Sequence, residues 1–341
     1  MASSYPGRNM FVGVGIQNGF AEAAGSGATV FTYYQIDEPR GGLEEYSEIA
    51  SNRRLNTRFR GAGYIGTKQV PAGFTVELNP ANAGRLLKLI FGTETVAVLV
   101  TAEAATHKFY PAESLSYGTI VLYAGGIAEA GTDDRSHKII NWKAARASIE
   151  GGVDDMMRLT VDGFGTDRSA VTSPTATFTT ARPFFLNSEE GTGVLSIGAT
   201  IGAVAAFAEC RRMRFEIDNA IAPDHRIDGD ASAAAVREGD SQITGMWDML
   251  YNDATYTELD IFTAGTNRAF QLVGTSVAAF YTALTYQITL AIEAARYNGA
   301  PPAWDPDVMS VEMPYIGELA SAQSISVTIR NADVVAYTYS V

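Results

Sequence analysis

A repeated order of residues constrains the fold of this chain more than any other feature. Each half contains a strand-like segment, an Asn, a short helical pattern and a Gly. These are Val70–Leu78, Asn79 and Gly92 in the first half, and Gln242–Tyr251, Asn252 and Gly265 in the second. In both halves the Asn and the Gly lie 13 residues apart, and the offset is 173 in a chain of 341 residues. The repeat predicts two tandem copies of one domain.

The first helical pattern has recognisable ends. Asn79 suits an N-cap and Pro80 suits the first helical position, where its missing N–H costs nothing. Gly92 provides a C-terminal stop. Between them an apolar stripe recurs at helical spacing, formed by Ala83, Leu86, Leu87, Ile90 and Phe91. In the second half we expect a helix over Asn252–Phe262, with Tyr256, Leu259 and Phe262 on one face.

Most other regular segments have the β-branched and aromatic composition of strands. We expect strands at Met10–Ile16, Thr29–Ile36, Val96–Thr101, His107–Tyr110, Thr119–Tyr123, Lys138–Ile149, Met156–Val161, Met213–Ile217, Gln242–Leu250, Leu284–Ala294 and Ser324–Ile329. Arg158–Asp162 resembles Ser326–Arg330, which would extend the repeat. The fold class predicted is mainly β, a sandwich or barrel with one flanking helix per unit.

The predicted domains are residues 1–170 and 171–341. Gly165–Pro183, rich in Ser, Thr and Ala, is the best candidate for the linker between them. Each half also contains a long polar stretch, Pro39–Gly66 and Pro223–Gly239, which we expect to be an arm-like loop. The edges of such sheets must be paired, covered or shared with neighbouring copies.

Composition and charge narrow the function classes. The chain is 46% hydrophobic and 18% charged, and its single cysteine, Cys210, excludes an intramolecular disulfide. No segment has the pattern of a signal peptide or a membrane span, so we expect a protein made in the cytoplasm and not inserted in a membrane. Residues 1–170 hold 16 Lys+Arg against 18 Asp+Glu, and residues 171–341 hold 9 against 20. This acidity disfavours tight binding of nucleic acid.

No motif points to catalysis, a cofactor or a metal. Gly13, Gly15 and Gly19 resemble a dinucleotide fingerprint, but the third glycine is displaced and no βαβ unit surrounds them. The three histidines are scattered, and the paired carboxylates fall in turn-like contexts. The run Asp224–Asp230 could offer carboxylates to Ca²⁺ but lacks EF-hand spacing, so a solvated turn is the default. We therefore expect no enzyme and no cofactor.

Four arginines within eight residues form the sharpest charge feature: Arg53, Arg54, Arg58 and Arg60. Arginine forms bidentate pairs with carboxylates. Because the second half is acidic, we favour contact between this cluster in one copy and the acidic face of another. A solvated loop and contact with DNA are the alternatives.

A family resemblance accompanies these features. Gly61–Gly92 (GAGYIGTKQVPAGFTVELNPANAGRLLKLIFG) resembles the major tail tube proteins of long-tailed, siphovirus-like bacteriophages, in which a strand leads into a short helix ending in Gly. His107–Tyr123 and Ile139–Gly165 are similar to the following strands of that family, and Arg212–Ile221 and Glu238–Gly245 to the opening of a second tube-like unit.

The resemblance implies two tandem tube-like units that assemble into stacked rings around a channel for DNA during ejection. Three copies would complete a pseudo-hexameric ring, and a hexamer is the alternative. The expected partners are further copies of the chain, the tape measure, tail terminator and tail tip proteins, and DNA in transient, non-specific passage. The expected location is the virion tail, after assembly in the host cytoplasm. A capsid decoration or receptor-binding module is the alternative function.

Overall fold

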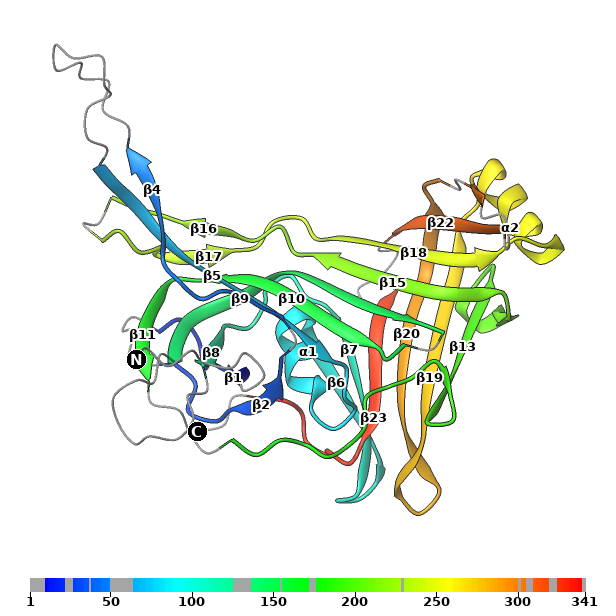
Figure 1. Ribbon diagram of the computed structural model, residues 1–341, viewed down its shortest axis with the longest axis horizontal. Coiled ribbons are helices and arrows are strands. Elements are labelled where there is room, and N and C mark those ends of the chain that lie inside the picture. Colours follow the sequence, from blue (N-terminus) through cyan, green and yellow to red (C-terminus); the bar gives the residue numbers. More distant parts are fainter. Residues whose placement is uncertain are drawn as a thin grey trace, which may run out of the picture.

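The computed structural model describes residues 10–21, 27–36, 38–49, 64–124, 136–153, 155–171, 176–227, 230–299, 302–304, 309–318 and 324–338. Over these ranges the chain is mainly antiparallel β-structure with two α-helices (Figure 1). The predicted mainly β class is therefore confirmed. Every strand expected from the sequence is present, with ends shifted by a few residues, and Met10–Ile16 and Gln242–Leu250 keep their predicted bounds.

One large sheet, here called the long sheet, contains strands from both halves of the chain. Every neighbouring pair in it is antiparallel. Its order is β3 (Glu38–Gly41), β5 (Tyr64–Glu77), β10 (Arg158–Gly165), β9 (Ser136–Gly152), β15 (Cys210–Asp218), β18 (Gln242–Leu250) and β22 (Met309–Gly317). A short strand, β21 (Pro302–Trp304), pairs with β22.

A second sheet, here called the hairpin sheet, is built mainly from two long hairpins. Its order is β6 (Gly92–Val100), β7 (Ala104–Pro111), β23 (Ile325–Asn331), β20 (Leu284–Tyr297), β19 (Arg268–Tyr281) and β13 (Gly191–Gly198). The short strands β12 (Asn187–Ser188) and β14 (Ala205–Phe207) pair with β13 on the side away from β19. The end of β20 also pairs with β22, so the two sheets meet at a corner.

A smaller sheet covers one end of the molecule. Its order is β2 (Thr32–Gln35), β1 (Met10–Ile16), β8 (Gly118–Ala124), the first part of β9, and β11 (Asp167–Val171). β9 passes from this sheet into the long sheet near Asn141, whose φ is 53°. The Asn141 side chain binds Gln17, Ala21 and Thr166, which holds this unusual backbone conformation in place.

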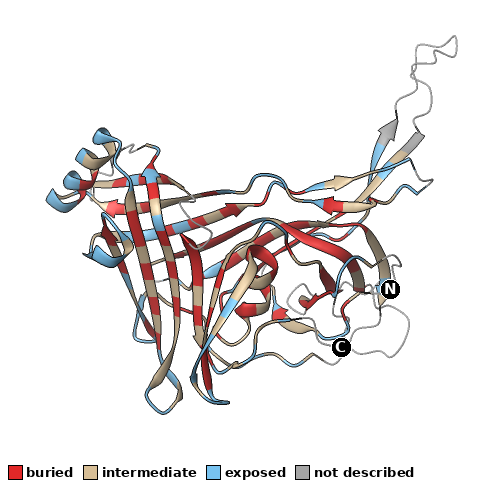
Figure 2. Cartoon of the chain, turned by 180° about the vertical axis from the view of Figure 1, so that it is seen from behind, coloured by how far each residue is buried: buried red, intermediate tan, exposed pale blue. Residues whose placement is uncertain are grey.

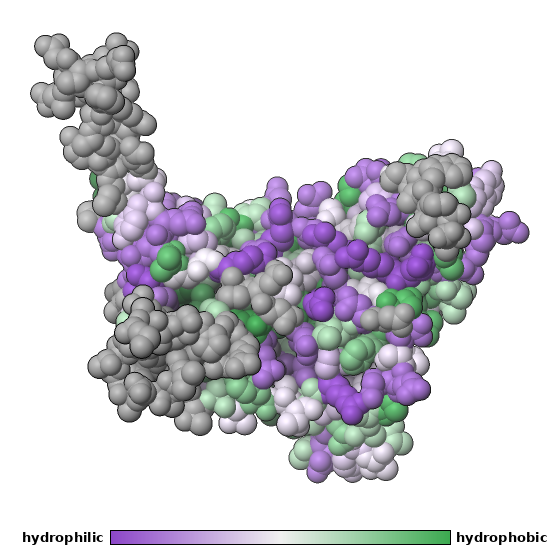
Figure 3. Space-filling model, in the orientation of Figure 1, coloured by the Kyte–Doolittle hydropathy of each residue, from purple (hydrophilic) through white to green (hydrophobic). Residues whose placement is uncertain are grey.

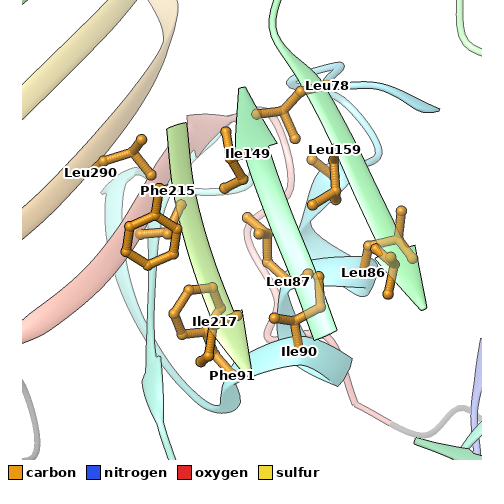
Figure 4. Packing of buried hydrophobic residues seen from close by; sticks show 14 of the residues in the cluster. Leu78, Leu86, Leu87, Ile90, Phe91, Ile149, Leu159, Phe215, Ile217 and Leu290 are labelled. Carbon is orange, nitrogen blue, oxygen red and sulfur yellow. The ribbon is translucent and has the colours of Figure 1, made fainter. Parts of the chain in front are cut away.

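Helix α1 (Ala83–Phe91) forms the centre of the core. Its apolar face packs against β9, β10 and β15, as Figure 4 shows for Leu87, Ile149 and Phe215. The stripe predicted for this helix, Ala83, Leu86, Leu87, Ile90 and Phe91, is buried throughout. By contrast, α2 (Asp253–Ala264) projects from the far end of the molecule. Leu259 and Phe262 pack partly against the core, whereas Tyr256 is 55% exposed.

The predicted start of the first helix is wrong. Asn79 does not cap α1, which begins four residues later at Ala83. The Asn79 side chain accepts a hydrogen bond from the backbone N–H of Ala81 and donates one to the carbonyl of Ala181, so it forms a turn before the helix. The helix ends before Gly92 as predicted, with φ of 85° at this glycine.

The two predicted arm loops contain β-structure. In the first, β4 (Glu45–Ile49) pairs with the start of β5, and in the second β16 (Ala222–Asp224) pairs with β17 (Ala235–Arg237). The predicted linker Gly165–Pro183 likewise contains β11, which pairs with β9. These segments are therefore not structureless loops in the part of the chain that the structure describes.

Within the described residues, two pairs of strands join the two halves of the chain. β9 pairs with β15, and β7 pairs with β23. One core cluster contains residues from both halves, such as Leu87 and Leu290. The division into domains near residue 170 thus stays a prediction.

The predicted match between Arg158–Asp162 and Ser326–Arg330 does not extend to the pairing of the strands. β10 lies between β5 and β9, whereas β23 lies between β7 and β20. In the second half the strand between β18 and β20 is β22. If β18 corresponds to β5, then β22 holds the position of β10.

Candidate assembly interface

The hairpin sheet ends on one side in an unpaired strand. Among the described strands, β6 pairs with β7 alone, so its other edge presents backbone N–H and C=O groups. Val98 and Leu99 on this strand are 54% and 48% exposed. A long apolar edge strand that is neither covered nor charged is a template for pairing with another chain.

The opposite end of the hairpin sheet is also open. On the side away from β19, the described strands that pair with β13 are only the short strands β12 and β14. Between them lie Gly193 and Val194, and Val194 is 47% exposed. The sheet therefore has an incomplete edge at each end, one formed by β6 and the other by β12, β13 and β14.

One face of the hairpin sheet is buried and the other is exposed. The strands alternate between buried and partly exposed residues, which Figure 2 shows as alternating red and tan bands. The buried face packs into the core through residues such as Phe109, Ile329 and Leu290. The exposed side chains are aligned by the register of the strands.

Two cross-strand rows of these exposed residues form what we call the hydroxyl face. The first row is Thr95, Lys108, Thr328, Thr289, Val273 and Val194, and the second is Ala97, Thr106, Arg330, Gln287, Thr275 and Thr192. Half of these residues are threonines. The only charged members are Lys108 and Arg330, and the guanidinium of Arg330 donates to the carbonyl and hydroxyl oxygens of Thr285 at 2.9 and 3.1 Å.

The tips of the two hairpins carry apolar side chains. β6–β7 and β19–β20 project at the same end of the molecule, at the bottom of Figure 1. On the β19–β20 tip Val277 is 61% exposed, and the rings of Phe280 and Tyr286 stack with centroids 4.7 Å apart. Exposed apolar groups of this kind mark contact surfaces.

The two arms lie together at the other end. The backbone N–H of Lys68 on β5 donates to the carbonyl of Ala231 at 2.7 Å. The backbone of Lys68 also forms an isolated parallel β-bridge with that of Ser232. The Lys68 ammonium lies 2.8 Å from Asp167 and 3.7 Å from Glu44. Burial alone would lower the pKa of Lys68, but the hydrogen bond and the charges of these carboxylates outweigh it and raise that pKa. Lys68 is thus tied to the first arm and to β11 by ion pairs, and to the second arm by backbone contacts.

The exposed face of the long sheet differs from the hydroxyl face. It carries a ladder of ion pairs across β9 and β15, in which Arg146 contacts Glu216 and Asp218, and Arg214 contacts Glu150 and Glu216. Figure 3 shows a hydrophilic band over the region of β15 and β18. Because these charges are largely exposed and already paired, each pair contributes little to stability.

The candidate site residues named from the sequence lie in different parts of the chain. Arg53, Arg54, Arg58 and Arg60 lie outside the described residues. In the run Asp224–Asp230, Asp224 pairs with Arg226 and Arg237, and Asp230 accepts from the N–H of Ser232. These carboxylates therefore already have protein partners; residues 228 and 229 are not described. Gly13 and Gly15 lie within β1, between β2 and β8.

Within the described ranges no group of three or more His, Cys, Asp or Glu side chains is arranged to hold a metal ion. No described helix has the length and apolar character needed to cross a bilayer.

Comparison of the sequence with known protein families identifies one family. A family model for the phage tail tube protein matches residues 7–329, which is nearly the whole chain. No curated protein matches the chain. The match indicates a structural component of the virion tail. The chain belongs to the phage tail tube protein family.

Proposed function

We propose that copies of this chain join edge to edge through their hairpin sheets to form the rings of a phage tail tube. The supporting observation is that this one-sided sheet has an unpaired strand at one end and an incomplete edge at the other. Pairing β6 of one copy with the β12–β14 edge of the next would give a closed barrel. Closure removes all free edges.

The repeated order of elements supports two tube-like units per chain. β5, α1 and the hairpin β6–β7 follow one another in the first half, and β18, α2 and the hairpin β19–β20 follow one another in the second. Both hairpins lie in the hairpin sheet. Three copies then supply six hairpins to a ring, while a hexamer remains the alternative.

The hydroxyl face is the proposed wall of the channel. It is the exposed face of the sheet that would close, and threonine dominates its two rows. Tight binding of DNA needs many Lys and Arg contacts to phosphates, and this face offers Lys108 and Arg330 in each copy. A wall of small hydroxyl side chains would let DNA pass during ejection without holding it.

The two ends of the molecule are the proposed contacts between stacked rings. The paired arms lie at one end and the apolar hairpin tips at the other (Figure 1). Arg53, Arg54, Arg58 and Arg60 would extend the arm contact toward carboxylates of a neighbouring copy. Stacked rings would form a tube in the virion tail, assembled in the host cytoplasm with the tape measure, terminator and tail tip proteins.

A charged edge strand tests this proposal. Replacing Val98 and Leu99 on β6 with lysine should prevent pairing between copies, because edge lysines block the approach of another strand. Electron microscopy and sedimentation of concentrated protein should show rings or tubes for the wild type and separate chains for V98K/L99K. The matched control is Tyr256→Lys, since Tyr256 is 55% exposed and lies on α2, which is not part of the hairpin sheet. Assembly of V98K/L99K at the wild-type level would contradict the proposed edge.

A further inference from the structure

The segment Asn331–Thr338, here called the strap, leaves β23 and crosses the base of the hairpin β6–β7. It is fastened by backbone groups: the carbonyl of Asp333 lies 2.7 Å from Nε2 of His107, and the N–H of Tyr337 donates to Oε2 of Glu94 at 2.8 Å. Nδ1 of His107 lies 2.7 Å from Oε1 of Glu94. The side chains of His107 and Glu94 are 0% and 2% exposed. The fastening is therefore shielded from water.

Both ring nitrogens of His107 face oxygen atoms. The carbonyl of Asp333 can only accept, so Nε2 must carry a proton. Nδ1 faces a carboxylate oxygen, and this contact needs one more proton, located either on Nδ1 or on Glu94. The geometry thus requires that the His107–Glu94 pair hold a proton beyond that of a neutral imidazole. Loss of that proton would leave two acceptors facing each other in a buried site.

Tyr337 fixes the strap to helix α1. Its ring lies 4.9 Å from that of His107 and 6.2 Å from that of Phe109, measured between centroids. It also covers Gly84, where an added Cβ would lie only 1.9 Å from the Tyr337 ring. Its hydroxyl donates to Asp333 and accepts from Asn331 at 2.9 Å. The glycine in α1 therefore makes room for the strap.

We propose that the strap is a pH-sensitive fastening, closed while His107 and Glu94 share their proton and loosened when that proton is lost. This inference is independent of the proposed tube, because every contact lies within one chain. Its consequence is local: β6, the open edge strand, carries Glu94, so opening of the strap removes a buried anchor from that edge.

The surroundings of His107 determine the direction of the pH effect. The titratable or charged groups that face this cluster are Glu94 on β6, Arg85 and Lys88 on α1, Tyr34 on β2, Tyr286 on β20, and Asp333 and Tyr337 on the strap. Burial by itself lowers the pKa of His107. The hydrogen bonds to Glu94 and to the Asp333 carbonyl, with the charges of both carboxylates, outweigh burial and raise that pKa above its usual range.

The sign of the linkage follows from this raised pKa. A histidine that titrates at higher pH in the folded chain contributes stability that is fully present below its unfolded pKa of about 6.5. This contribution is lost as the pH rises through the folded value. The strap should therefore be closed in mildly acidic solution and should open on alkalinisation.

Hydrogen exchange of the full-length chain tests this proposal. The observable is the protection factor of the Tyr337 amide, corrected at each pH for the intrinsic exchange rate. In the wild type we expect constant protection below the unfolded His107 pKa of about 6.5, a fall of up to about tenfold per pH unit between this value and the raised folded pKa, and constant weaker protection above it. Protection that stays constant from acidic to alkaline pH would overturn the proposal.

Two matched variants test whether the proton shared by His107 and Glu94, and not a general loosening of the fold, controls the opening of the strap. His107→Gln cannot exchange a proton in this range, so the Tyr337 amide should show weak protection that does not change with pH. His225→Gln, on the second arm, should keep the wild-type profile. A wild-type profile in H107Q would show that another group controls the strap.

Two further measurements do not depend on the folding of H107Q. In the wild-type chain, ¹⁵N spectra of the His107 ring should show both nitrogens hydrogen-bonded at neutral pH, and a neutral ring with a free Nδ1 would overturn the proposal. Gly84→Ala raises helix propensity but displaces Tyr337, so it should weaken strap protection even in acidic solution. Unchanged protection in G84A would show that Tyr337 does not anchor the strap.

Discussion

Lys143 is the clearest case of a buried charge whose value depends on its partner. Its side chain is 3% exposed, and its ammonium lies 2.5 Å from Glu238 and 4.1 Å from the centre of the Tyr117 ring. Glu238 also accepts from the N–H of Leu115 at 2.8 Å. Lys143 thus connects β9 to the base of the second arm. Removing one member of a buried pair leaves the other charge uncompensated.

We therefore predict that Lys143→Met destabilises the chain by about 3–5 kcal/mol, measured by urea unfolding. The matched control is Arg146→Met on the same strand, because Arg146 is 58% exposed although it contacts Glu216 and Asp218. It should cost less than about 1 kcal/mol. Equal costs for the two variants would show that burial does not decide the value of these pairs.

The same pair predicts a loss of stability in acid. Burial raises the pKa of Glu238, but the hydrogen bond from Lys143, with further hydrogen bonds and the Lys143 charge, lowers it overall. A carboxylate with a depressed folded pKa adds stability that is present above its unfolded pKa and lost as the pH falls through the folded value. Urea midpoints should therefore fall in acid less steeply for K143M than for the wild type. Parallel pH profiles would contradict this assignment.

At the scale of elements, the two helices show what a sequence pattern can and cannot predict. Both have the predicted C-terminal glycine, and Asn252 caps α2 through a hydrogen bond from the N–H of Thr255. Asn79 has the same place in the sequence but turns toward Ala181, a residue 102 positions away. The pattern also could not show that α1 is enclosed by strands while α2 lies exposed. Local signals predict helices, whereas their environment depends on distant segments.

The sequence did not predict strands β13, β19 and β22, and their local residues explain why. β22 contains Pro314, which lacks a backbone donor and argues against a central strand, yet it pairs with β18 through the remaining residues. β13 and β19 are interrupted by glycine and alanine, which weakens their β signal. The candidate interface depends on β13 and β19, so the open edge at β13 could not be predicted from the sequence. The alternation of buried and exposed residues in β7 and β20 was the available signal for the hydroxyl face.

The caps of the two helices give a direct test at this scale. Asn252→Ala should lower stability by about 1 kcal/mol, because it removes the acceptor for the Thr255 N–H. Asn82→Ala at the start of α1 is the matched control, since Asn82 makes no side-chain capping bond, and it should cost less than about 0.5 kcal/mol. Unfolding in urea measures both. A larger cost at Asn82 would mean that its side chain supports α1 in another way.

At the scale of the whole molecule, the chain combines four distinct surfaces with one main core. The hydroxyl face and the ion-pair ladder belong to different sheets, and the arms and hairpin tips lie at opposite ends. Because β9 pairs with β15 and β7 with β23, the two halves cannot move apart without breaking two lines of strand pairing. The chain is thus suited to act as one rigid segment of a ring.

A cryo-EM map of the assembled protein would show directly which strands join neighbouring copies. We expect rings in which β6 of each copy pairs with the β12–β14 edge of its neighbour. We also expect the threonines of the hydroxyl face to line the channel, with three copies in each ring. A map with β6 unpaired on the outside of the ring, or with the ion-pair ladder of the long sheet facing the channel, would contradict this arrangement.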